Sequence, residues 1–119
     1  MRRADRLFQL MLLLQQHFDD YLQLVWPELN VNVVSTTEQW AGAAIAGPQS
    51  RNVLQKLFPD TDVSNEGLAF MGYLEANLFG VNARIFRISF SGELAYEVNV
   101  ESDNGNFMWE KIIEIGKNF

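Results

Sequence analysis

Apolar residues recur at intervals of three and four along the first 25 residues of the chain. The residues in this pattern are Leu7, Leu10, Met11, Leu14, Phe18, Tyr21, Leu22 and Val25. Such spacing stacks side chains on one face of a helix, so we expect an amphipathic helix over residues 4–25. Proline disfavours helical geometry in the residue before it, and Pro27 should therefore end this helix.

After a short linker the pattern changes to β-rich runs, separated by turn residues and two further helical segments. The runs predict strands at residues 40–46, 72–79, 81–90 and 93–100 and helices at residues 48–58 and 102–116, and residues 31–35 form a further short β-rich stretch. Ser102 is the expected cap of the last helix. This order predicts an α+β fold, a fragment of a ferredoxin-like split βαβ plait with an additional N-terminal helix. We expect the helices to cover one sheet face and leave the other for a neighbouring domain.

The segment from Phe86 to Glu97 predicts two strands joined by a two-residue Ser91-Gly92 loop. Glycine beside a small polar residue favours such a loop, because the loop needs positive φ. Side chains alternate along a strand, so one sheet face would carry Phe86, Ile88, Phe90, Glu93, Ala95 and Glu97. In this register Phe86 lies opposite Glu97, and Phe90 lies opposite Glu93. Aromatic rings beside carboxylates suit a planar ligand that carries N–H donors.

The opposite face of this hairpin reads as core. It would carry Ile85, Leu94, Tyr96, Val98 and Val100, with Arg87 among them. A buried arginine needs a partner, so we expect Arg87 to pair with a backbone carbonyl or with Glu75, Glu38 or Asp62. For Glu97 the alternative is a side chain that simply points into water, since charged residues are mostly exposed. Spacing alone favours that alternative.

Composition and charge narrow the function further. The chain has 119 residues, the length of one compact domain, and a formal net charge of −6 at pH 7. Nucleic acids and anionic membranes attract positive surfaces, so we expect neither as a partner. There is no cysteine and only one histidine, His17, and no nucleophile or phosphate-loop motif occurs. We therefore expect no metal and no catalytic residue. No apolar run reaches the ~20 residues of a membrane span, and we expect a cytoplasmic protein.

Six stretches carry a family resemblance. They are residues 26–29, 36–41, 46–51, 62–66, 70–72 and 86–97, the last reading Phe-Arg-Ile-Ser-Phe-Ser-Gly-Glu-Leu-Ala-Tyr-Glu. The chain resembles the aminomethyltransferase-like, folate-binding domain of the heterotetrameric sarcosine oxidase alpha subunits. The wider family includes the glycine-cleavage T protein and dimethylglycine dehydrogenase. The expected organisation is the N-terminal amphipathic helix at residues 1–25 followed, as the resemblance implies, by part of this folate-binding domain at residues 26–119.

The resemblance also implies a ligand and its site. In that family the last glutamate of the motif binds the pterin ring of tetrahydrofolate, and the motif aromatic lies close by. These positions are Glu97 and Phe90 here, and Phe86 would add apolar contact. The folate captures the one-carbon unit from sarcosine oxidation as methylenetetrahydrofolate, whereas flavin and NAD belong elsewhere in the complex. With the resemblance added, the folate-binding interpretation of Glu97 is preferred over the solvated one.

Three alternatives and two expectations complete the sequence analysis. The chain could be a glycine-cleavage aminomethyltransferase, a non-catalytic interaction module with a plait fold, or a DNA-binding regulator using its basic start at Arg2, Arg3 and Arg6. We expect a fragment of the folate-binding domain that has no oxidase activity alone. We also expect partners: the other sarcosine oxidase subunits if the protein is full length, and homo-oligomers for the fragment, because an uncovered apolar sheet face promotes self-association.

Overall fold

The computed structural model describes residues 13–90 and 92–119, and the chain divides into two compact units at Thr36–Thr37. In the first unit, residues 13–20 are α-helical and continue as a π-helical turn over Tyr21–Val25. The predicted amphipathic helix is thus confirmed for residues 13–25, and residues 4–12 lie outside the described part. The short β-rich stretch at residues 31–35 is not part of a strand. None of the described strands pairs with this run, so its backbone gains no ladder of hydrogen bonds.

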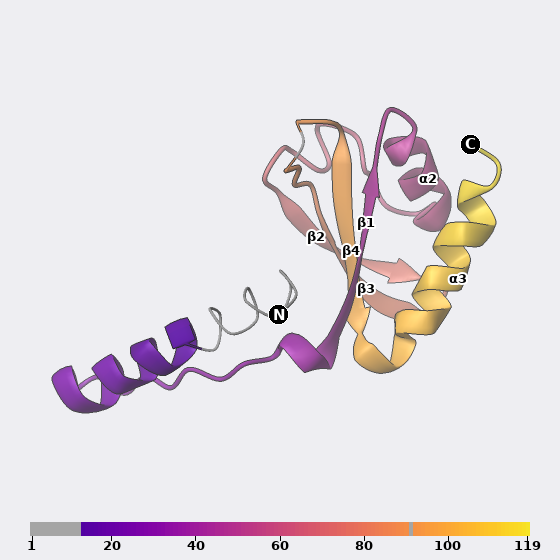
Figure 1. Cartoon of the computed structure of the whole chain (residues 1–119). Helices are drawn as coiled ribbons and strands as arrows, with labels where there is room; N and C mark the ends of the chain where they lie inside the picture. The colour runs from indigo at the N-terminus through magenta and orange to yellow at the C-terminus, as the bar shows by residue number, and fades with distance from the viewer. Residues whose placement is uncertain (1–12, 91) are drawn as a thin grey trace, which may run out of the picture. The chain divides into compact units, whose positions relative to one another are not determined.

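The second unit contains a four-stranded antiparallel sheet with two α-helices on one of its faces (Figure 1). Its elements are β1 (Trp40–Ala46), α2 (Ser50–Leu57), β2 (Tyr73–Leu78), β3 (Val81–Phe86), β4 (Ala95–Glu101) and α3 (Gly105–Gly116). The strands lie in the order β1-β4-β3-β2. This arrangement confirms the predicted α+β class and is consistent with a ferredoxin-like plait fragment that has an N-terminal helix.

The connections show how the plait is built. Both β1 and β3 run antiparallel to β4, so β1 and β3 are parallel to each other with β4 between them. The chain crosses from β1 to the far side of β4 through α2, which is the split βαβ arrangement. The strand β2 is the added one, and it pairs with β3 as a hairpin at the edge of the sheet.

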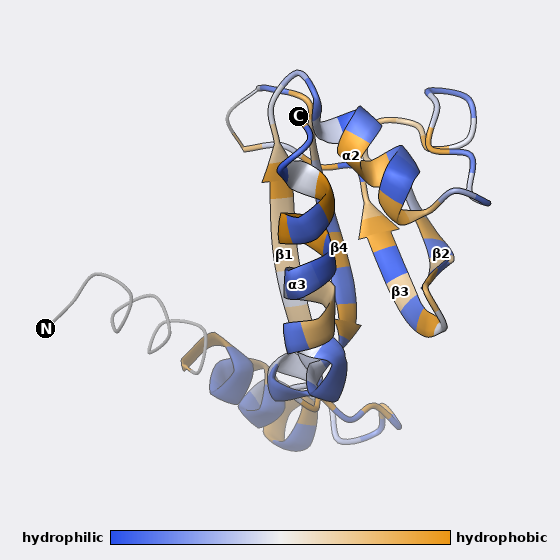
Figure 2. Ribbon diagram, turned by 90° about the vertical axis from the view of Figure 1, so that its right-hand side faces the viewer, coloured by the Kyte–Doolittle hydropathy of each residue, from blue (hydrophilic) through white to orange (hydrophobic). Residues whose placement is uncertain are grey.

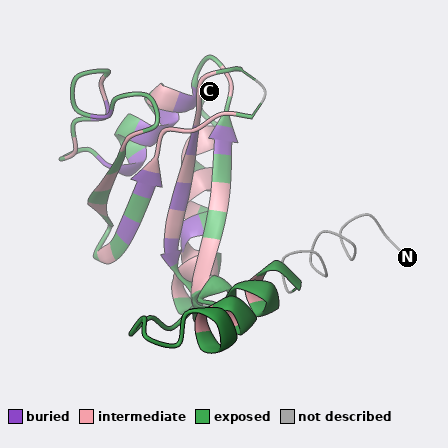
Figure 3. Ribbon diagram, turned by 90° about the vertical axis from the view of Figure 1, so that its left-hand side faces the viewer, coloured by how far each residue is buried: buried purple, intermediate pink, exposed green. Residues whose placement is uncertain are grey.

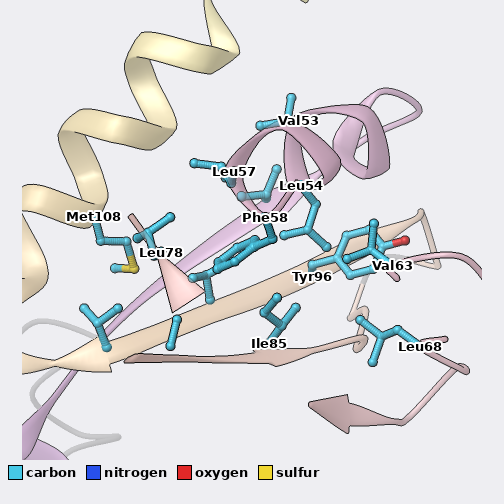
Figure 4. Packing of buried hydrophobic residues seen from close by; sticks show 14 residues of the cluster. Val53, Leu54, Leu57, Phe58, Val63, Leu68, Leu78, Ile85, Tyr96 and Met108 are labelled. Carbon is cyan, nitrogen blue, oxygen red and sulfur yellow. The ribbon is translucent and has the colours of Figure 1, made fainter. Parts of the chain in front are cut away.

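The hydrophobic core lies between the sheet and the two helices. Its members alternate along the strands with residues of the other face, as Figures 2 and 3 show by hydropathy and burial. The fully buried side chains include Leu54, Leu57, Phe58, Val63, Leu68, Leu78, Ile85, Tyr96, Val98 and Val100. Figure 4 shows Leu54 of α2 and the following Phe58 between the helix and the sheet residues Tyr96 and Ile85, with Met108 of α3 at one end of the cluster. The predicted core face of β4 is therefore confirmed.

Two predicted details of the hairpins and helices are wrong. Residues 87–94 contain no strand among those described, so β3 and β4 are joined by a loop and not by two residues. The register is nevertheless the predicted one, with Phe86 opposite Glu97. Ser102 does not cap α3; it begins a 3₁₀ turn, Ser102–Asn104, and α3 starts after Asn104 without a side-chain capping bond.

Candidate functional site

The face of the sheet away from the helices, which we call the open face, carries a row of four residues across all four strands. Glu97 of β4 lies between Ala44 of β1 and Phe86 of β3, and Phe86 lies opposite Tyr73 of β2. The Phe86 and Tyr73 rings are stacked, with centroids 5.5 Å apart and planes inclined by 25°. The structure therefore places one carboxylate next to a floor of two aromatic rings.

The Glu97 side chain is available to a ligand. Among the described residues it has no hydrogen-bonding or ion-pair partner, and the residue is only partly buried. Its neighbours toward β1 are small, namely Ala44 across the strand pair and Ala95 along β4. Small side chains leave room above the sheet, so a flat group could lie beside the rings and reach the carboxylate.

Phe90 is not on the strand where the sequence placed it. It lies in the loop between β3 and β4, and its side chain is 99% exposed. On either side of this loop the backbone groups bond to other segments of the chain. Arg87 donates its N–H to the carbonyl of Gly72 and accepts from the N–H of Met71 on the β2 side, and the Leu94 carbonyl accepts from the turn after β1. The structure thus brings Glu97 and Phe86 together but leaves Phe90 apart from them, facing solvent.

The donors to Leu94 come from the turn that joins β1 to α2. The N–H of Gly47 and the hydroxyl of Ser50 both donate to the Leu94 carbonyl, at 2.9 and 3.0 Å. The next residue, Arg51, donates from Nε to the hydroxyl of Tyr96 at 2.8 Å. Tyr96 is fully buried, and a buried phenol needs a hydrogen-bonding partner. These contacts fix the first residues of β4, the strand that carries Glu97.

Arg51 also connects a third segment to this point. Its Nη2 donates to Oδ1 of Asn65 at 2.7 Å, which joins the loop after α2 to the start of β4. All three segments belong to the stretches that carry the family resemblance, but the sequence alone predicted no positioning role for Ser50, Arg51 or Tyr96. The available signal was Tyr96 itself, because a tyrosine on a predicted core face calls for a polar partner nearby.

Arg87 binds a backbone carbonyl, which is one of the two kinds of partner predicted for it. Its Nη1 donates to the backbone carbonyl of Leu68 at 3.0 Å, and none of the three predicted acids pairs with it. Its Nε is buried and has no partner among the described residues. The residue borders a surface cavity whose other lining residues are Phe70, Ser89, Gly92, Glu93, Leu94 and Ala95. Arg87 thus ties the loop that precedes β2 to the end of β3.

The far end of the open face is polar. The Arg84 guanidinium lies 4.1 Å from the centroid of the Trp40 ring, and its Nε is 3.7 Å from Oε1 of Glu75. Pairing an arginine with both a ring and a carboxylate orders this end of the surface. Glu75 is therefore committed to Arg84, whereas Glu97 is not committed to any described side chain.

Away from the open face, the carboxyl group of Asp62 has a lowered pKa. The side-chain hydrogen bond from Ser64, and then the bond from its backbone N–H at 2.9 Å, lower the pKa of Asp62. Over residues 13–90 and 92–119 no cluster of three potential metal ligands occurs. No helix in the same residues is both long and apolar enough to cross a membrane.

Comparison with known proteins finds a family model that matches the whole chain and relatives that match most of it. The family model of the GCVT N-terminal domain matches residues 1–119. The sarcosine oxidase subunit alpha of Corynebacterium sp. (strain P-1) is 47% identical over 102 residues, which are 85% of this chain and 10% of that protein. That of Rhizobium meliloti (strain 1021) is 44% identical with the same coverage. An aminomethyltransferase of Deinococcus deserti is 30% identical over 81% of this chain and 26% of its own length. The chain spans about a tenth of the length of the sarcosine oxidase alpha subunits.

Proposed function

Because the chain belongs to the GCVT N-terminal domain family, we propose that the open face of its sheet binds the pterin ring of tetrahydrofolate. The folate would accept the one-carbon unit from sarcosine oxidation, giving methylenetetrahydrofolate. Identities of 44–47% to sarcosine oxidase alpha subunits, against 30% to an aminomethyltransferase, support a role in sarcosine oxidation over one in glycine cleavage. In this proposal the partners are the other subunits of a sarcosine oxidase, and flavin and NAD bind elsewhere in the complex.

The observation that carries the proposal is the uncommitted carboxylate of Glu97 beside an aromatic floor. A carboxylate accepts two parallel hydrogen bonds from a ring N–H and an adjacent amino group, the donor pair that a pterin presents. Binding that pair needs no change in the rest of the site, since no described residue competes for the Glu97 oxygens.

The stacked Phe86 and Tyr73 rings would contribute the apolar side of the site. Aromatic rings pair with planar groups in offset-stacked or edge-to-face arrangements, which suits a pterin held next to them. Phe90 would approach the ligand from the loop between β3 and β4, and its exposure leaves the ring free to do so. Ser50 and Arg51 act as positioning residues, because they hold the start of β4 and thereby Glu97.

The test is a calorimetric titration of tetrahydrofolate, under anaerobic conditions, into the wild-type chain and two variants. Glu97→Gln keeps the size of the side chain but replaces a charged acceptor by a neutral amide. We expect it to weaken binding by about tenfold or more, since a charge-assisted bond pair is replaced by weaker bonds. Glu101→Gln is the matched control on the same strand and face, and it should bind as the wild type does.

Two results would contradict the proposal. One is equal affinity of wild type and Glu97→Gln, which would make Glu97 a solvated residue. The other is an equal loss for Glu97→Gln and Glu101→Gln, which would indicate a general effect of charge and not a site.

A second candidate function, a non-catalytic interaction module, is favoured by the first unit. The described part of this unit exposes large apolar side chains, namely Leu13, Leu14, Phe18, Tyr21, Leu24, Val25, Trp26, Leu29, Val31, Val33 and Val34. A surface of this kind is typical of a contact with another protein. A chain that binds no tetrahydrofolate in the titration above would support this second candidate.

A further inference from the structure

The open face carries a second uncommitted polar side chain next to Glu97, that of Asn99. We propose that Asn99 donates a hydrogen bond to an oxo group of the bound ring, while Glu97 accepts from the neighbouring N–H donors and the ring stands on edge above β4 against Phe86. The site then selects rings that carry an amino group, a ring N–H and an oxo group side by side along one edge. This inference rests on the proposed function, because it describes how the same site holds its ligand.

The position of Asn99 follows from the strand β4. Asn99 comes two residues after Glu97, so both side chains lie on the open face, with Cα atoms about 6.8 Å apart. Its side chain leans toward β1, because a Cβ added at Gly42 would lie only 2.6 Å from Asn99 Oδ1. The lack of a side chain at Gly42 makes room for the amide, which therefore lies on the β1 side in the row next to Glu97.

The Asn99 amide has no competing partner in the described structure. Over residues 13–90 and 92–119 its side chain takes part in no hydrogen bond. Arg84, its neighbour across the β3–β4 pair, is directed instead to the Trp40 ring and to Glu75. A ligand that accepts a hydrogen bond from Nδ2 of Asn99 therefore displaces no bond within this part of the chain.

The Phe86 ring offers one face to a ligand. Its other face is turned to Tyr73, since two nearly parallel rings with centroids 5.5 Å apart overlap face to face, whereas rings lying flat in one plane at that distance would collide. Tyr73 belongs to β2, on one side of Phe86, and β4 with Glu97 lies on the other side. A planar ligand stacked on the second face of Phe86 thus stands above β4, with one edge running along that strand.

The edge of such a ring meets Glu97 and Asn99 in turn. A carboxylate accepts two parallel hydrogen bonds from an amino group and a ring N–H, and a side-chain amide donates to an oxo group. A pterin has these three groups in succession along one edge, just as Glu97 and Asn99 follow each other along β4. Ala44 is small and exposed opposite Glu97 on β1, which leaves room for the ring between Ala44 and Phe86.

The test compares two ligands by anaerobic calorimetric titration into the full chain. They are tetrahydrofolate and tetrahydroaminopterin, in which an amino group replaces the oxo group. Asn99→Asp keeps the size of the side chain but leaves only hydrogen-bond acceptors at neutral pH. We expect it to weaken tetrahydrofolate binding and to shift the ratio of the two dissociation constants by about tenfold or more in favour of the amino analogue, because a buried polar group without a partner is strongly rejected.

Asn82→Asp is the matched control. It makes the same change of charge on the same face of the sheet, on β3, in the row beyond Arg84. The ratio of the two dissociation constants should stay as in the wild type, since that ratio cancels effects common to both ligands. Circular dichroism verifies that each variant is folded.

Methyl NMR of the alanine-labelled chain tests the stacked position without any variant in the site. Bound tetrahydrofolate should shift the methyl resonance of Ala44, which lies beside the ring. It should leave the resonance of Ala43 unchanged, because that side chain packs against the core on the other face.

Three results would overturn the inference, and they separate it from the proposed function. Folate binding is retained but the role of Asn99 is refuted if Glu97→Gln weakens binding while Asn99→Asp leaves the ratio unchanged, or if Asn82→Asp shifts it equally. An Ala44 resonance that does not respond to bound tetrahydrofolate refutes the stacked position. A wild-type chain that binds neither ligand refutes the proposed function and this inference together.

Discussion

The hydrogen bond between Arg51 and Tyr96 is the contact whose removal we expect to report most directly on how firmly α2 holds the start of β4. Tyr96 is fully buried, and its hydroxyl accepts from Arg51 Nε at 2.8 Å. The two perturbations are Tyr96→Phe, which removes the acceptor and keeps the ring, and Arg51→Met, which removes the donor and keeps much of the stem. Neither substitution touches Glu97 itself.

The expected magnitudes follow from burial. A hydrogen bond to a charged group contributes about 1.5–3 kcal/mol, and leaving a buried hydroxyl without a partner costs about 1–3 kcal/mol. Arg51 is only partly buried and can bond to water once the phenol is gone, so Tyr96→Phe should cost about 1–2 kcal/mol of the free energy of unfolding. Arg51→Met should cost more, because it also loses the bond to Asn65.

A double-mutant cycle isolates the contact between the two side chains. The free energies of unfolding would be measured by urea denaturation of wild type, both single variants and the double variant, followed by circular dichroism. We expect a coupling energy of about 1–2 kcal/mol. A coupling energy indistinguishable from zero would refute the reasoning, because the two groups would then contribute independently. Asn65→Ala serves as the control for the second Arg51 bond.

Three further predictions concern stability. Gly67→Ala should cost about 1–3 kcal/mol of the free energy of unfolding in urea denaturation, because the added Cβ would collide with the Asp62 carbonyl oxygen. An unchanged midpoint would contradict this close contact. Because the pKa of Asp62 is lowered, its ionised form stabilises the fold at pH values above the ordinary pKa of 3.8, and this contribution is lost as the pH falls through the lowered pKa. The Asp62→Asn variant should therefore lose less stability than the wild type between pH 5 and pH 3. Parallel curves of unfolding free energy against pH would refute this prediction. Leu57→Ala should lower the free energy of unfolding by about 2–5 kcal/mol, because the Leu57 side chain is fully buried. At the exposed neighbouring position, Lys56→Ala should change it by less than about 0.5 kcal/mol. Equal effects of the two substitutions would show that the helix is wrongly oriented.

The sequence was sufficient for the elements whose patterns are long and regular. Ala95–Glu101 alternates apolar residues with small or polar ones, and its faces follow from that alternation, whereas Trp40–Ala46 is a continuous run of small and apolar residues bounded by turn residues. The β3–β4 register was also predictable, because placing the loop at Ser91-Gly92 fixes which residues oppose each other. Hence Phe86 and Glu97, two of the three predicted ligand contacts, lie together on the open face.

The remaining parts depend on contacts between distant segments, which local patterns do not contain. The Leu94 carbonyl bonds to the β1–α2 turn, more than 40 residues earlier in the chain, and no local pattern predicts that contact or the exit of Phe90 from the sheet. The short run at residues 31–35 has strand-like composition but no strand beside it. The sequence predicted a hydrogen-bonding partner for Arg87 but not which one. The partner is the carbonyl of Leu68, and its position depends on how the loop before β2 folds.

Two hydrogen bonds hold the Leu94 carbonyl, so the sequence of the β3–β4 loop can be changed separately from the position of Glu97. Since the first residue before β4 is clamped to the entry of α2, residues 88–92 can be lengthened, shortened or exchanged for a foreign peptide without shifting the carboxylate that follows. An engineer seeking altered ligand preference could therefore diversify this segment as a library while the scaffold under it stays fixed.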